Sequence, residues 1–224
     1  MMSSFKEQYD CIMNNRLDVN SLKKEVEYNK NDCAFFFTKD DPNWLLSNMA
    51  GKMPVFYSRS KQWNSSEQLY QATKYPPGTL CVPESAHHNN SVEPDVRKRI
   101  EAATNARGAK MTQKCAVSAG LVRKDWDDPD WEIRIYSMLW VLELKLRYNP
   151  STFGKVLRET GTKDIVEISK KDAFWGCHVY GGKLEGQNVL GKLLMMVRDR
   201  APEIKSGEFS HPTGFLLTEG GGAE

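Results

Sequence analysis

The most apolar stretch of the chain, residues 130–148, constrains the fold more than any other segment. Its apolar side chains recur at helical spacing on one side (Trp131, Ile135, Met138, Leu139, Leu142, Leu146) and also occupy the other faces (Ile133, Trp140, Val141, Leu144). A helix that is apolar all round is buried all round. We therefore predict a central core helix over Asp130–Tyr148, capped by Asp128, with Pro129 at its first position.

Shorter segments predict the elements around this helix. Helical spacing and caps predict helices over residues 63–75, 95–106, 109–119, 151–158 (capped by Ser151) and 189–200, and short apolar runs predict strands over 33–37, 54–57 and 164–168. This mixture predicts an α+β fold, a single helix-rich domain with a few short strands over residues 32–202. Residues 1–31 are expected to form an N-terminal helical extension. Residues 203–224, polar and glycine-rich after Pro202, are expected to be a disordered tail.

Composition narrows the class of protein. Of the 224 residues, 27% are charged, the mean hydropathy is −0.58, and apolar runs such as 193–197 are too short to span a bilayer. With no apolar signal core at the N-terminus, we expect a cytoplasmic or nuclear protein. The five cysteines are scattered without a CxxC pair, so neither a disulfide framework nor a metal site is expected. A net charge of +2 permits nucleic-acid contact but does not argue for it.

The stretch from Trp63 to Tyr75 is the first candidate for chemistry. Ser65 followed by Gln68 is typical of a capping box at a helix start. Glu67, Gln71 and Lys74 then fall on one helix face, because they are spaced i, i+4 and i+7. An acid, an amide and an amine on one face are compatible with the wall of a polar pocket or with an ordinary solvated surface.

A second acid, Asp172, follows the strand predicted over 164–168 and stands beside Phe174 and Trp175. Two carboxylates that flank a glycosidic bond are the usual device for hydrolysing it. Asp172 has an alternative role as the cap of the turn into Trp175-Gly176. The tryptophans at 63, 126 and 175 can stack on a nucleobase, although tryptophan is more often a core residue.

The last candidate is a glycine-bearing turn into a helix at residues 186–191. Free backbone N–H groups at such a turn can hold a phosphate. The segment lacks the spacing of the known phosphate-binding glycine motifs.

Five motifs in this order resemble the NADAR (YbiA-like) family, over about Phe35 to Arg200. They are Leu46-Ser47-Asn48, the stretch from Trp63 to Tyr75, Arg123-Lys124-Asp125-Trp126, Lys171-Asp172-Ala173-Phe174-Trp175-Gly176, and the stretch from Gly186 to Arg198. The chain departs from the family pattern at Met49, where an aromatic residue is common, at Gln68, where histidine is common, and in a long insertion over 76–94.

The resemblance implies a domain that hydrolyses N-glycosidic bonds between ribose C1 and an exocyclic amine. Relatives act on phosphoribosylamino-pyrimidine intermediates of riboflavin synthesis or remove ADP-ribose from guanine in DNA. We expect the second activity, on an ADP-ribosylated nucleobase or a nucleotide-like small molecule, with DNA open as a partner, no membrane and no cofactor. The alternatives are the first activity, a non-catalytic ADP-ribose or NAD binding module, and a scaffold that uses residues 1–30 as its partner surface.

The same resemblance implies the site residues. Catalytic roles fall to Glu67 as base or cation stabiliser, Asp172 as proton donor or partner acid, Trp126 as a stacking surface, and Lys74 as the amine of a Schiff base if the ribose ring opens. The expected substrate-binding residues are Ser47, Asn48, Trp63, Gln71, Arg123, Trp175, Gly176, Asn188 and Arg198.

Overall fold

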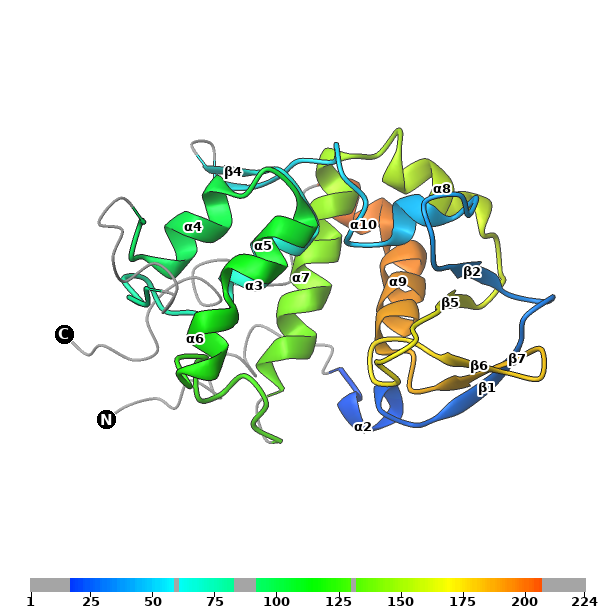
Figure 1. Ribbon diagram of the computed structural model, residues 1–224. Coiled ribbons are helices and arrows are strands. Elements are labelled where there is room, and N and C mark those ends of the chain that lie inside the picture. Colours follow the sequence, from blue (N-terminus) through cyan, green and yellow to red (C-terminus); the bar gives the residue numbers. More distant parts are fainter. Residues whose placement is uncertain (1–16, 59–60, 83–91, 130–131, 207–224) are drawn as a thin grey trace, which may run out of the picture.

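In the computed structural model, which describes residues 17–58, 61–82, 92–129 and 132–206, one long helix divides the molecule (Figure 1). This helix, α7 (Ile133–Tyr148), is buried along most of its length, and Ile135 and Trp140 are fully enclosed. The prediction of a central core helix is confirmed. Its predicted start is wrong, because the N-cap is Glu132, which has a left-handed φ of 45°. The Glu132 N–H donates to the Asp128 carbonyl at 2.8 Å, and residues 130–131 lie outside the described residues.

One side of α7 is covered by four short helices: α3 (Ser66–Ala72), α4 (Val96–Ala102), α5 (Ala106–Thr112) and α6 (Lys114–Ser118) (Figure 1). Beside them lies an antiparallel hairpin of β3 (Val55–Ser58) and β4 (Lys61–Trp63). The four helices confirm those predicted over 63–75 and 95–106, and the one predicted over 109–119 is divided at Gln113. This side therefore presents α3 to α7.

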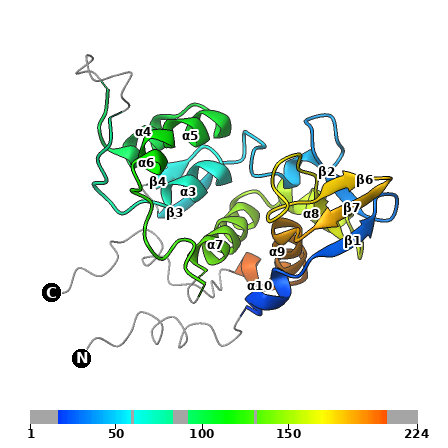
Figure 2. The same cartoon turned by 60° about the horizontal axis from the view of Figure 1, so that its bottom comes forward.

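On the other side, β5 (Ile165–Glu167) pairs in parallel with β2 (Ala34–Phe36), and α9 (Val189–Asp199) packs against both β5 and α7 (Figures 1 and 2). A Cβ atom at Gly191 in α9 would lie 2.0 Å from the Ile165 carbonyl oxygen, so only glycine allows α9 to approach β5 this closely. The short η1 (Trp44–Leu46), α8 (Phe153–Glu159) and α10 (Ala201–Ser206) complete this side. The molecule is α+β, as predicted.

A three-stranded sheet of β1 (Val26–Asn29), β7 (Lys183–Gly186) and β6 (His178–Tyr180) corrects the prediction for the N-terminal segment. The described part of residues 1–31 holds only the short helix α2 (Val19–Leu22), and the chain then forms β1. Tyr28 is buried while its neighbours are exposed, and β1 gains its backbone hydrogen bonds from β7. The domain boundary at residue 31 stays a prediction.

Two further local predictions are wrong. Ser151 does not cap α8, whose N-cap is Thr152. The chain also continues helically past Pro202, because α10 runs to Ser206 and buries Ile204 against the core. The predicted tail beyond residue 206 and the predicted helix over residues 1–16 lie outside the described residues. None of the described helices has both the length and the apolarity needed to cross a bilayer.

Candidate active site

A cavity of about 400 Å³, which we call the central cavity, lies between α3, the start of α7, β5 and the loop after β5. Its polar lining residues are Ser47, Asn48, Glu67, Gln71, Lys74, Lys110, Asp127, Arg134, Glu167, Ser169 and Asp172; its other lining residues are Met49, Tyr70, Trp126, Met138, Trp175 and Leu190. Segments that are far apart in the sequence thus meet around one space.

The polar face of α3 forms one wall of this cavity. Ser65 Oγ accepts a hydrogen bond from the Gln68 N–H at 3.2 Å, which confirms the predicted cap. Glu67 and Gln71 are 6% and 2% exposed, so the solvated-surface interpretation is wrong. Gln71 Nε2 donates to Glu67 Oε1 at 2.6 Å, whereas the buried Gln71 Oε1 has no partner among the described residues. That oxygen is available to accept a hydrogen bond from a ligand.

The floor of the cavity is formed by the chain after η1. Ser66 Oγ on α3 donates to Asn48 Oδ1 at 2.8 Å, which fixes the Asn48 amide beside α3. Lys145 on α7 is fully buried, and its Nζ donates to the carbonyls of Leu45 (2.9 Å), Leu46 (3.4 Å) and Ser47 (2.8 Å). Burial lowers the pKa of Lys145 to about 7, and the negative charge of Glu67 opposes this shift. A buried ammonium therefore ties this floor to the core helix.

Lys74 follows α3 and extends the same wall. Its Nζ lies 5.6 Å from the ring centroids of both Tyr70 and Trp126, which pack against each other at 5.3 Å. Burial lowers the pKa of Lys74, while the Glu67 carboxylate acts in the opposite direction. The neutral, nucleophilic amine is thus more accessible to Lys74 than to a solvated lysine.

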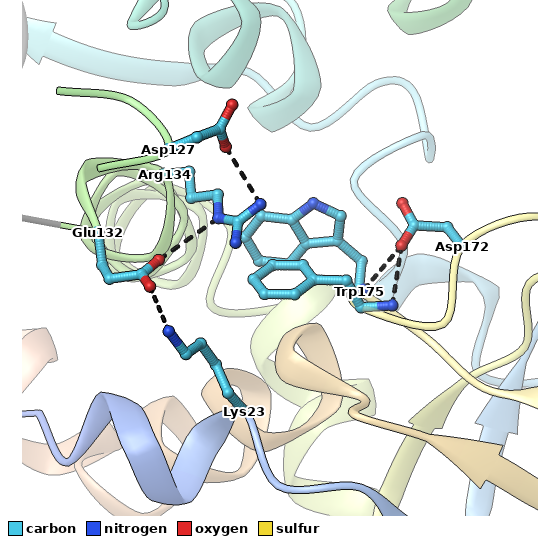
Figure 3. Close-up of polar contacts among 7 residues, drawn as sticks. Lys23, Asp127, Glu132, Arg134, Asp172 and Trp175 are labelled. Atoms are coloured by element: carbon cyan, nitrogen blue, oxygen red, sulfur yellow. Dashed lines mark hydrogen bonds and ion pairs between the residues drawn. The ribbon is translucent and has the colours of Figure 1, made fainter. Parts of the chain in front are cut away.

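Asp172 combines both interpretations offered by its sequence context. Its Oδ1 accepts hydrogen bonds from the N–H groups of Phe174 and Trp175, each at 3.0 Å, and the residue also lines the cavity (Figure 3). Trp175, held by this turn, lines the cavity and meets the Tyr70 ring edge-on at 5.8 Å. The turn presents an acid and an aromatic side chain together.

Arg134 at the start of α7 contributes a cation to this side of the cavity. It pairs with Asp127 at 3.1 Å and with Glu132 at 3.5 Å, and its guanidinium lies 3.9 Å from the Phe174 ring centroid (Figure 3). Glu132 also binds Lys23. These contacts connect the loop before α7 to the turn that carries Asp172.

Glu167, the last residue of β5, is a cavity carboxyl that the sequence analysis missed. Burial raises its pKa to about 7, and the charges of Glu67 and Asp172 act in the same direction. Asn188 fixes β5 on either side of Val166, because its Nδ2 donates to the Ile165 carbonyl (2.8 Å) and its Oδ1 accepts from the Glu167 N–H (3.2 Å). The sequence feature that indicates Glu167 is an acidic residue that follows two apolar residues of a short strand.

Some of the predicted substrate-binding residues do not line the central cavity. Trp63 is 3% exposed in the core, and Asn188 is fully buried as the N-cap of α9. Gly176 faces β5, since a Cβ there would lie 2.6 Å from the Glu167 carbonyl oxygen. These residues shape the frame of the cavity.

The predicted arginines also bind elsewhere. Arg123 makes a two-point ion pair with Asp125 at 2.6 and 2.8 Å, and its N–H donates to the Lys74 carbonyl at 2.9 Å. Arg198 donates to Thr160 Oγ1 (3.0 Å) and to the Lys163 carbonyl (2.7 Å). Neither lines the central cavity.

The phosphate-binding interpretation of residues 186–191 is not supported. The N–H groups of Val189 and Leu190 at the start of α9 donate to the carbonyls of Phe174 and Trp175 at 3.0 and 3.1 Å. These two N–H groups hold the Asp172 turn against α9 and are therefore already used within the protein.

Comparison with known proteins is consistent with this arrangement. The sequence model of the NADAR domain matches residues 35–201. The chain is 30% identical to a riboflavin biosynthesis protein of Vibrio vulnificus over 75% of the chain, and the match spans only 38% of that protein. It is also 30% identical to an N-glycosidase of Nostoc punctiforme, over 64% of the chain and 78% of that protein. The solution structure of the Escherichia coli protein YbiA resembles it with a TM-score of 0.55 at 24% identity, covering 80% of this chain and 90% of the other.

Proposed function

Because the chain belongs to the NADAR family, we propose that it is an N-glycosidase that cleaves the bond between ribose C1 and an exocyclic amine. The single observation that supports this most strongly is the meeting of Glu67 and Glu167 in one cavity, with a raised pKa at Glu167. Glycoside hydrolysis needs one carboxyl group that donates a proton and one carboxylate that stabilises positive charge. Two similar side chains acquire these different roles from their surroundings.

In the direct route, the C1–N bond breaks and its electron pair stays on the leaving nitrogen. We assign the proton for that nitrogen to Glu167, because a pKa of about 7 leaves its acid form populated at neutral pH. The Glu67 carboxylate, held by Gln71, stabilises the oxocarbenium ion at C1. Water then adds to C1 and returns its proton to Glu167. Asp172, which the sequence analysis proposed as proton donor or partner acid, acts here as the partner acid.

In the second route, the nitrogen lone pair opens the ribose ring to an imine, and the ring oxygen takes up a proton. Lys74 then attacks C1 and expels the amine, which leaves the sugar on Lys74 as a Schiff base that water hydrolyses. The lowered pKa of Lys74 supports this route. Borohydride reduces a Schiff base to a stable amine, so trapping should add the mass of the sugar to the wild-type protein and not to Lys74→Ala. Trapping that persists in Lys74→Ala would exclude Lys74 as the amine.

We propose ADP-ribosylated guanine in DNA as the substrate. In this adduct the ribose C1 is joined to an exocyclic amine, as the reaction requires, and the rings of Trp126 and Trp175 at the cavity are suitable surfaces for a base. Phosphoribosylamino-pyrimidines are the second candidate, which the similarity to the Vibrio vulnificus riboflavin biosynthesis protein favours.

The test is to incubate the purified full chain with an oligonucleotide that carries ADP-ribosyl-guanine and to measure the mass of the DNA. Loss of the ADP-ribose mass is expected. The Glu67→Gln variant should lower kcat by at least about 10²- to 10³-fold, because it removes the charge and keeps the shape. Glu159→Gln, on the exposed face of α8, is the matched control and should retain full activity.

An unchanged mass would move the assignment to phosphoribosylamino-pyrimidines, tested in the same assay with the free nucleotide. A fully active Glu67→Gln variant would contradict the role of Glu67. If neither substrate is hydrolysed but ADP-ribose binds, the protein is the non-catalytic binding module instead.

A further inference from the structure

A second cavity, of about 490 Å³, adjoins the central cavity and shares Ser169 with it. It lies where the chain leaves β2 and β5 and passes β6. Its lining residues are Lys30, Phe37, Ile168, Ser169, Lys170, His178, Val179 and Tyr180. We call it the basic cavity, because none of its described lining residues is acidic, whereas two are lysines.

The two cavities differ in charge, because among the described residues acids line only the central cavity. The central cavity is lined by four acids, Glu67, Asp127, Glu167 and Asp172, which stand among three cations, Lys74, Lys110 and Arg134. A diphosphate placed among these acids would meet like charges at short range, and the repulsion is larger in a partly buried site than in water. The same diphosphate beside Lys30 and Lys170 would meet only cations among the described lining residues. Charge therefore separates a place for the reacting ribose from a place for phosphates.

Aromatic side chains in the basic cavity supply a second kind of contact. Phe37 is 40% exposed and Tyr180 is 56% exposed, which is unusual for rings of this size. Lys170 Nζ lies 5.7 Å from the Phe37 ring centroid, so a cation and a ring stand side by side. An exposed ring next to a lysine suits a planar base joined to a phosphate, because the base stacks and the lysine pairs with the phosphate.

His178 is held in a defined orientation at this cavity. Its Nδ1 lies 2.8 Å from the Ser169 carbonyl oxygen, and since a carbonyl only accepts, Nδ1 carries the proton. The His178 ring also meets the Tyr180 ring edge-on at 6.2 Å. His178 thus connects Ser169, which lines both cavities, to Tyr180 in the basic cavity.

We propose that the basic cavity binds the adenosine diphosphate part of the substrate while the ribose C1–N bond lies in the central cavity. This inference rests on the proposed function. Phe37 and Tyr180 offer the stacking surface for adenine, and Lys30 and Lys170 neutralise the diphosphate. The cavity then favours ADP-ribosylated substrates, because a phosphoribosylamino-pyrimidine has one phosphate and no adenosine to place there.

Binding of ADP-ribose to the full chain, measured by calorimetry, tests this directly. Lys170→Glu should weaken ADP-ribose binding by at least about tenfold, since it replaces a charge-assisted contact with a repulsion. Tyr180→Ala should also weaken ADP-ribose binding and leave ribose 5-phosphate binding unchanged. Lys155→Glu on the exposed face of α8 makes the same charge change outside both cavity linings and should have no effect. Circular dichroism checks that each variant is folded.

Kinetics with two substrates separates the sources of any effect. For the ADP-ribosyl-guanine oligonucleotide, Lys170→Glu should raise KM by about tenfold and leave kcat nearly unchanged, because the residue does not touch the reacting atoms. For the phosphoribosylamino-pyrimidine, which has one phosphate and no adenosine, Lys170→Glu should lower kcat/KM less than it does for the oligonucleotide, and Tyr180→Ala should leave kcat/KM unchanged. An equal loss on both substrates would overturn the inference. A second result would also overturn it. If an unmodified single-stranded oligonucleotide competes with the substrate, and Lys170→Glu abolishes this competition but not ADP-ribose binding, the basic cavity holds a flanking nucleotide of DNA.

The failures of the two proposals are distinguishable. If ADP-ribose binding depends on Lys170 but no substrate is hydrolysed, the basic cavity stands and the proposed activity is wrong. If hydrolysis depends on Glu67 but substitutions of Lys170 and Tyr180 change neither ADP-ribose binding nor KM, the proposed activity stands and the proposed role of the basic cavity is wrong.

Discussion

Two walls of the central cavity are built in different ways. The α3 wall takes Glu67, Gln71 and Lys74 from one short stretch of chain, and a hydrogen bond from Gln71 fixes Glu67 within it. The opposite wall takes Glu167 from β5 and Asp172 from the following turn, and it depends on contacts with α9. The residues of the first wall are neighbours in the sequence, whereas those of the second are brought together by packing between separate elements.

This difference predicts where the site is sensitive to substitution. A conservative change in the α3 wall alters one chemical group and leaves its frame, because the helix and its cap remain. The opposite wall can be displaced by residues that never contact the cavity. Glu67→Gln, described above, tests the α3 wall, and the predictions below test the assembled parts.

The largest effect is expected from Glu167→Gln, which removes the proposed proton donor from the opposite wall. The rate of hydrolysis should fall by about 10²- to 10⁴-fold, the range that a positioned general acid contributes. In the wild type, activity should fall as pH rises through about 7, because the acid form of Glu167 is lost there. Measuring kcat/KM of the wild type and of Glu167→Gln as a function of pH tests the loss of rate and the pH dependence.

Glu185→Gln on β7, an exposed position, is the matched control and should leave the rate and the profile unchanged. If Glu167→Gln keeps full activity, the proton comes from elsewhere, and Asp172, the donor proposed from the sequence, becomes the group to replace next.

The cavity floor should respond like an assembled wall. Lys145→Met removes the ammonium that three carbonyls share, and the buried acceptors lose their donor. The free energy of unfolding should fall by about 2–4 kcal/mol, as expected when buried polar groups lose their partners. Urea denaturation measures this. Lys155→Met, an exposed lysine on α8, should change stability by less than about 0.5 kcal/mol, and equal stabilities of the two variants would contradict the structural role of Lys145.

The α3 wall could be predicted from sequence because its information is local. Ser65 and Gln68 mark the helix start, and the i, i+4 spacing places Glu67 and Gln71 on one helix face, whereas Lys74 follows the end of α3 at Ala72. Burial of that face could not be read from spacing, because it depends on α5 and α7, which pack against α3.

The parts that could not be predicted depend on distant segments. The segment Val26–Asn29 forms a strand because β7 pairs with it, and its own sequence is equally compatible with a charged helix. From the sequence, Glu167 is an ordinary strand residue, and only the folded chain shows that it lines the central cavity. Asn188 and Gly176 were identified by family resemblance, and the structure puts both against β5 and outside the cavity lining.

A smaller effect is expected from Gly191→Ala, which tests the frame behind Glu167. The new Cβ would lie 2.0 Å from the Ile165 carbonyl oxygen, so α9 and β5 must move apart. Overpacking of this kind costs about 1–3 kcal/mol, and a shift of the Glu167 side chain should lower kcat in the folded variant. Gly108→Ala in α5, where the new Cβ makes only ordinary contacts, should lower neither stability nor kcat. Unchanged kcat in Gly191→Ala would show that the opposite wall tolerates displacement.

The last effect, confined to one range of pH, is a dependence of stability on pH that belongs to Glu167 alone. Its pKa is about 7 in the folded protein against an ordinary value of 4.5, so the folded state binds more protons than the unfolded state between these values. The free energy of unfolding therefore falls as pH rises across this window, and Glu167→Gln lacks this loss. Relative to wild type, the variant should gain about 1–3 kcal/mol between pH 4.5 and pH 8, measured by urea denaturation. Glu159→Gln should show no such trend. A constant difference across the pH range would mean that Glu167 ionises as a solvated acid, and the opposite wall would then supply a second carboxylate and not the proton donor.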